Sequence, residues 1–103
     1  MAIFKELNKK GYKHYYDGTV EELDSMDKDN QHLHSEIMQV IMWLYEKYKI
    51  WIQVFILNKT FAWKVQDVNT LVITCLYAQQ DKGYNSPTEA YEAAIEYTLN
   101  KLI

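Results

Sequence analysis

The sequence predicts an α+β fold: two helices and three strands in the order α-β-β-β-α, forming a two-layer domain with both helices on one face of an antiparallel sheet. Three observations predict it: helical spacing of apolar residues over 31–48, strand-like residues over 49–66, and a helix start at Ser86. We place this domain at residues 31–103, after a polar N-terminal segment of residues 1–30. At 103 residues, the chain is long enough to bury one hydrophobic core.

Short helices are expected within the polar segment. Residues 2–10 are predicted to form the first helix, because Gly11 is a typical helix-ending residue. Thr19 and Glu22 have the spacing of a capping box, in which each side chain accepts a hydrogen bond from the backbone of the other. They predict a second short helix that continues to about Met26.

The longest predicted helix covers residues 31–48. Its apolar side chains recur every three or four residues, which places them on one face. That predicted core face consists of Leu33, Ile37, Val40, Ile41, Leu44 and Tyr48. Met42 and Trp43 fall outside this face, beside the polar side of the helix.

A tight hairpin is predicted around Asn58 and Lys59. Asn tolerates the positive φ that a two-residue turn needs, so Leu57 is expected to pair with Thr60. In this register the inward face is wholly apolar and consists of Ile50, Ile52, Val54, Ile56, Phe61, Trp63 and Val65. The outward face is mixed and consists of Trp51, Gln53, Phe55, Leu57, Thr60, Ala62, Lys64 and Gln66. Because a shift by one residue would mix these two sets, the pattern specifies the register.

The last two elements are a strand and a helix. A third strand is predicted over residues 71–77, with a helix over the same residues as the alternative. Ser86 at the N-cap, Pro87 at the first helical position and Glu89 at the third predict a helix that runs to about Leu102.

Charge and cysteine content exclude several classes of protein. All eleven basic residues are lysines, and the formal net charge is −3. Arginine is the preferred bidentate partner of phosphate and guanine, so its absence argues against nucleic-acid binding. The one cysteine, Cys75, cannot form an internal disulfide, and its apolar neighbours predict a buried, inert thiol. No stretch is apolar enough for a membrane span or signal peptide, so we expect a cytoplasmic protein that does not bind membranes.

No catalytic, metal or cofactor motif is found. His32 and His34 lie two residues apart at a helix start, which points their rings to different sides, whereas zinc needs three or four convergent ligands. Asp27 and Asp29 lack the later glycine and glutamate of a calcium loop. The three glycines are not clustered, so no phosphate-binding loop is predicted. We therefore expect no catalytic residue, no metal and no cofactor, in a protein that is not an enzyme.

Two runs carry a first resemblance. Trp43–Ile52 (WLYEKYKIWI) and Ser86–Ile95 (SPTEAYEAAI) are similar to short hypothetical proteins that recur in bacterial mobile elements and phages. The resemblance covers residues 33–103. It implies a helix–strands–helix plan and a phage or mobile-element origin, and it implies no particular activity.

The α-β-β-β-α order carries a second resemblance, to the double-stranded RNA-binding domain. In that family, lysines at the start of the last helix bind phosphates. Here Thr88, Glu89 and Glu92 occupy that place, and only the alanine spacing over 90–94 matches the packing part of the motif. The resemblance therefore implies a shared fold without the RNA-binding function.

The function we expect is protein interaction, either as a homodimer or with a host protein. Large apolar side chains outside the predicted core usually mark an interface. The candidate interface residues are Trp51, Phe55 and Leu57 on the outer hairpin face and Met42 and Trp43 on the first long helix. The alternative is that residues 1–30 fold over this hairpin face.

Two other functions stay open. The first is nucleic-acid binding, because aromatic rings interleaved with lysines can stack single-stranded bases. Its candidate contacts are Lys9, Lys10, Lys13, Tyr12, Tyr15 and Tyr16. The second is capture of a small ligand, such as a nucleotide, in an aromatic pocket at a subunit boundary.

Overall fold

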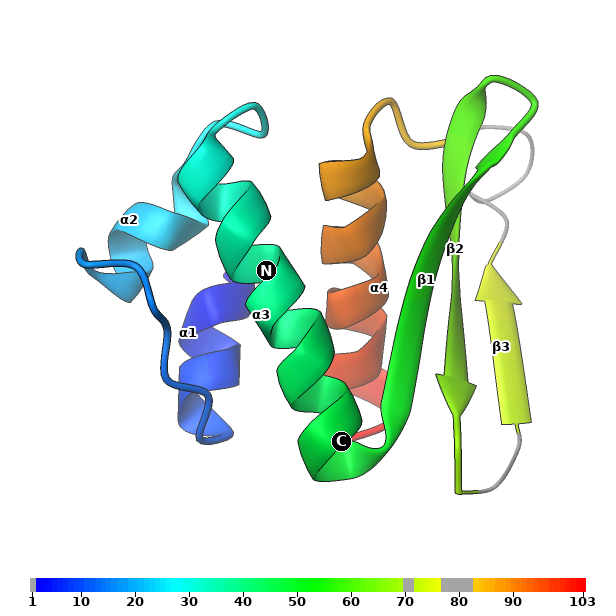
Figure 1. Ribbon diagram of the computed structural model, residues 1–103, viewed down its shortest axis with the longest axis horizontal. Helices are drawn as coiled ribbons and strands as arrows, with labels where there is room; N and C mark the ends of the chain where they lie inside the picture. The colour runs from blue at the N-terminus through cyan, green and yellow to red at the C-terminus, as the bar shows by residue number, and fades with distance from the viewer. Residues whose placement is uncertain (1, 70–71, 77–82) are drawn as a thin grey trace.

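The computed structural model describes residues 2–69, 72–76 and 83–103, which form an α+β fold (Figure 1). The elements are α1 (Ile3–Lys9), α2 (Val20–Asp24), α3 (Gln31–Tyr48), β1 (Ile50–Leu57), β2 (Thr60–Asp67), β3 (Val72–Leu76) and α4 (Pro87–Lys101). The antiparallel hairpin of β1 and β2 packs against α4, and α3 packs beside β1.

The two short helices predicted near the start of the chain are confirmed. Gly11 follows α1 with φ +101°, a backbone conformation that favours glycine. The capping box of Thr19 and Glu22 is formed at the start of α2. The Asp24 carboxylate caps α1 from a distance in sequence, because it accepts hydrogen bonds from the N–H groups of Phe4 at 2.8 Å and Lys5 at 3.1 Å.

Helix α3 has the predicted bounds and, with one exception, the predicted core face. The Asn30 side chain caps its start by accepting from the N–H of His32 at 2.8 Å, and Lys49 ends it in a left-handed conformation. Leu33, Ile37, Val40, Ile41 and Leu44 are buried, while Tyr48 is only half-buried at the margin of the core.

The hairpin register is confirmed from Leu57↔Thr60 to Ile50↔Asp67. Asn58 and Lys59 both have positive φ, 50° and 67°, as a tight hairpin turn with right-handed strand twist requires. Of the predicted inward face, Ile50, Ile52, Trp63 and Val65 are fully buried.

Two positions of the hairpin differ from the prediction. Ile56 was expected to face the core but is 71% exposed, because it lies next to the turn, where the hairpin projects past the helices (Figure 1). Ala62 was expected on the outer face but is only 1% exposed. Its small side chain belongs to the residue that pairs with Phe55 in the hairpin register.

Beyond the hairpin, β3 pairs antiparallel with β2 from Asp67↔Val72 to Trp63↔Leu76. Residues 71 and 77, the ends of the predicted strand, and the side chain of Cys75 lie outside the described part of the chain. The predicted start of α4 is confirmed, since the Ser86 hydroxyl accepts from the N–H of Glu89 at 3.2 Å.

Residues 2–30 form an additional layer on the helices. In Figure 1, α1 and α2 lie on the side of α3 and α4 that faces away from the sheet. Their buried residues Ile3, Phe4, Leu7 and Leu23 belong to the same core cluster as α3, α4 and the hairpin. The N-terminal segment therefore leaves the outer face of the hairpin uncovered.

Candidate functional site

A row of exposed apolar side chains runs along the solvent side of α3. Met38, Met42 and Tyr45 are spaced by four and then three residues, which places them on one face of the helix. They are 43%, 47% and 37% exposed, and their row lies next to the helix face that is buried in the core. Together with Trp51, which is 37% exposed, we call these residues the outer seam.

Trp51 extends the row from α3 onto β1. The rings of Tyr45 and Trp51 meet edge to face, with their centroids 5.7 Å apart. The ammonium group of Lys49 lies 5.2 Å from the centroid of the Tyr45 ring. Aromatic and cation–π contacts of this kind hold the two rings in a fixed geometry while much of their surface stays in water.

The outer seam lies beside an open sheet edge. Strand β1 is at the end of the strand order β1-β2-β3, so among the described strands it is paired on one side only. Trp51 is a residue of β1 itself, so the end of the seam that Tyr45 and Trp51 form lies at this strand. An edge strand of eight residues offers a row of backbone donors and acceptors to another chain.

The structure separates the interface residues that the sequence predicted. Met42 and Trp51 belong to the outer seam, whereas Phe55 and Leu57 are half-buried on the outer hairpin face. Trp43 is partly covered, because its ring packs edge to face against Tyr12 at 5.4 Å and against Tyr48 at 5.6 Å. Sequence reasoning missed Met38 and Tyr45, although their spacing from Met42 was a usable signal.

The tyrosines proposed to stack nucleic-acid bases do not form a platform. Tyr12 is 2% exposed, and its hydroxyl donates to the carboxylate of Glu36. Tyr16 donates to Glu22 at 3.2 Å, and only Tyr15, at 72%, is widely exposed. Stacking needs several accessible ring faces, and this segment offers one.

Two of the three lysines in the same proposal are also engaged. The Lys9 ammonium pairs with Glu6 at 3.2 Å, and that of Lys10 donates to the backbone carbonyl of Ile103 at 2.9 Å. Lys13 is exposed. Of the six candidate residues, Tyr12 is thus buried, and Lys9, Lys10 and Tyr16 have hydrogen-bond or ion-pair partners within the chain.

A buried carboxylate that the sequence did not reveal holds this segment in place. Glu36 of α3 is 2% exposed and accepts from the hydroxyl of Tyr12, from the N–H of Tyr15 at 3.0 Å and from the N–H of Tyr16 at 2.7 Å. Burial, followed by the hydrogen bond to Glu36, raises the pKa of the Tyr12 phenol well above its usual value. The role of Glu36 is therefore to anchor the chain between α1 and α2.

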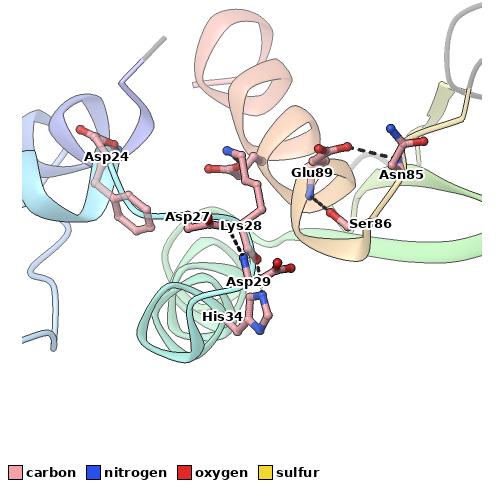
Figure 2. Close-up of polar contacts among 10 residues, drawn as sticks. Asp24, Asp27, Lys28, Asp29, His34, Asn85, Ser86 and Glu89 are labelled. Atoms are coloured by element: carbon pink, nitrogen blue, oxygen red, sulfur yellow. Dashed lines mark hydrogen bonds and ion pairs between the residues drawn. The ribbon is translucent and has the colours of Figure 1, made fainter.

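One pocket of about 310 Å³ lies between the start of α3 and the start of α4. Lys28, Asp29 and His34 line it near the start of α3, and Ser86, Pro87 and Thr88 line it at the start of α4; Figure 2 shows Lys28, Asp29, His34 and Ser86. The His34 ring is fixed by a 2.6 Å hydrogen bond between its Nε2 atom and the backbone carbonyl of Lys28.

Within residues 2–69, 72–76 and 83–103, no group of three His, Cys, Asp or Glu side chains is placed to hold a metal ion. Over the same residues, no helix is both long and apolar enough to cross a membrane. Comparison with protein families, curated proteins and solved structures found no match to this chain.

Proposed function

We propose that this chain is a protein-binding module without catalytic activity of its own, and that its partner is a second copy of itself. The observation that carries the proposal is the outer seam, a row of four large exposed apolar side chains that ends at Trp51 on the edge strand β1. Exposed apolar groups that cluster in this way are typical of interaction surfaces.

A second copy fits this side of the molecule because both of its features are self-complementary. A two-fold axis beside β1 would pair the two edge strands antiparallel and bring the two seams together in the same step. The spacing of Met38, Met42 and Tyr45 is the one with which two helices interdigitate their side chains. One acidic and one basic residue, Glu46 and Lys49, flank the seam, so two copies would not meet as blocks of like charge.

Sedimentation velocity over a range of protein concentrations tests this proposal. We expect the wild type to sediment as a dimer, and the Met42→Lys variant to sediment as a monomer at the same concentrations. A lysine at the centre of the seam would be buried without a partner in the dimer, which weakens association strongly. Trp51→Ser is expected to shift the equilibrium in the same direction by removing an aromatic anchor.

Leu102→Lys is the matched control, because Leu102 is 40% exposed and lies outside the seam. This variant should remain a dimer. At protein concentrations low enough for every protein to be monomeric, all three variants should unfold at the same urea concentration as the wild type. A wild type that stays monomeric at all concentrations would contradict self-association. A dimer that survives Met42→Lys would place the interface elsewhere.

A further inference from the structure

The pocket between α3 and α4 has an apolar floor and polar walls. Ile37, Met38, Pro87 and Tyr91 supply the apolar part. Its volume of about 310 Å³ is at the small end of the roughly 300–1,000 Å³ typical of ligand pockets. An apolar group the size of one amino-acid side chain suits this floor.

The α4 wall offers two unused hydrogen-bond donors on one residue. Thr88 is 5% exposed and lines the pocket, and neither its hydroxyl nor its N–H has a partner among the described residues. Pro87 has no N–H, and the N–H of Glu89 is bound by the Ser86 hydroxyl, so Thr88 carries the free donors of this helix start. The positive end of the α4 dipole adds to them, so this wall favours a carboxylate.

The opposite wall offers acceptors. The backbone N–H of Asp29 donates to Asp27, but the Asp29 carboxylate itself has no partner among the described residues. The Nε2 atom of His34 lies 2.6 Å from the backbone carbonyl oxygen of Lys28, which only accepts, so Nε2 is the donor of this hydrogen bond. Lys28 also lines this wall, but its ammonium is paired with Glu92. This wall therefore favours an ammonium group.

We propose that this pocket binds a free α-amino acid with an apolar side chain, a function beyond self-association. Its carboxylate meets the Thr88 hydroxyl and N–H, its ammonium meets Asp29, and its side chain lies on Ile37, Met38 and Tyr91. The opposite charges of the two walls match the zwitterion. A phosphate-bearing ligand such as a nucleotide fits poorly, because the one lysine is paired and the Asp29 carboxylate would repel phosphate.

Titration of the full chain with L-leucine, monitored by backbone amide NMR spectra, tests the proposal. We expect saturable shifts at Thr88 and Asp29. Leucinamide, which lacks the carboxylate, and 4-methylpentanoate, which lacks the ammonium, are each expected to bind at least tenfold more weakly, because each leaves one charged wall unpaired.

Two variants assign the walls. Thr88→Val and Asp29→Asn should each raise the dissociation constant for leucine about tenfold or more. Neither substitution should lower the free energy of unfolding by an amount that would explain this loss of binding. The matched controls are Thr98→Val, which removes a buried α4 hydroxyl outside the pocket, and Asp17→Asn, an exposed aspartate outside it. Both controls should bind leucine like the wild type.

The proposal is overturned if leucine gives no saturable shift at Thr88, or if 4-methylpentanoate or leucinamide binds as tightly as leucine. Equal weakening by Thr98→Val would also overturn it, because the loss would then reflect a general loosening of α4. Failure of this experiment leaves the sedimentation result for the outer seam unaffected, since that result does not depend on leucine.

Discussion

At the scale of single residues, the carboxylate of Glu36 connects the N-terminal segment to α3. A buried carboxylate is costly unless its oxygens are hydrogen-bonded, and here three donors from residues 12–16 satisfy it. Helical spacing indicates which side of a helix is apolar. It does not indicate that an acidic residue beside that face will be covered by a loop that lies about twenty residues earlier in the sequence. Glu36 was missed for this reason.

Tyr12 gives this contact a predictable pH dependence. Its folded-state pKa is raised above the usual value of 10.0, first by burial and then by the hydrogen bond to Glu36. The unfolded chain therefore releases the phenol proton first, and the stability that Tyr12 provides is fully present below pH 10 and is lost as the pH rises further. Urea unfolding of the wild type and Tyr12→Phe from pH 7 to pH 11 measures this. The stability difference between them should shrink by up to about 1.4 kcal/mol per pH unit above pH 10.

Tyr15→Phe is the matched control, because the Tyr15 ring is 72% exposed. Its stability should follow that of the wild type throughout the pH range. Parallel curves for the wild type and Tyr12→Phe between pH 9 and pH 11 would show that the pKa of the Tyr12 phenol is not raised in the folded protein.

At the scale of elements, the most local signals were the most reliable. The bounds of α3, the register of the hairpin and the cap of α4 were all predictable, because each depends on residues within a few positions of one another. The exposure of Ile56 was not predictable, because it depends on where the helices end relative to the hairpin. The second face of α3 was overlooked because Met42 was considered without Met38 and Tyr45.

The hairpin turn contains a correctable strain. Lys59 has φ 67°, a conformation that costs a side chain with a Cβ atom about 1–2 kcal/mol. Lys59→Gly should relieve it and raise the free energy of unfolding by roughly 0.5 kcal/mol or more, after the entropic cost of glycine is subtracted. Urea unfolding at neutral pH gives the value.

Gln53→Gly provides the comparison, because Gln53 is an exposed residue in the middle of β1. Glycine there should lower stability by about 0.5–1 kcal/mol. Two variants that destabilise equally would mean that the positive φ of Lys59 carries no cost in this turn.

At the scale of the whole molecule, the N-terminal segment belongs to the same core as the rest of the chain. The sequence suggested a division between residues 1–30 and 31–103, because the first part is polar. Four of its apolar residues, Ile3, Phe4, Leu7 and Leu23, are nevertheless buried in the same core cluster as the rest of the chain. Composition gives the number of apolar residues in a segment, but it does not indicate which of them are buried against another part of the chain.

Phe4→Ala tests whether this shared core makes the chain one cooperative unit. Phe4 is 1% exposed, so its loss should lower the free energy of unfolding by about 3–5 kcal/mol. In a single cooperative unit, amide hydrogen exchange at Ile52 and Val65 of the hairpin should become faster by the factor that corresponds to this loss of unfolding free energy. This should hold although both residues lie in another layer. Lys5→Ala, at an exposed position of α1, should change neither quantity. If Phe4→Ala loosens α1 alone while Ile52 and Val65 keep their protection, residues 1–30 unfold as a separate unit and the division suggested by composition is the correct one.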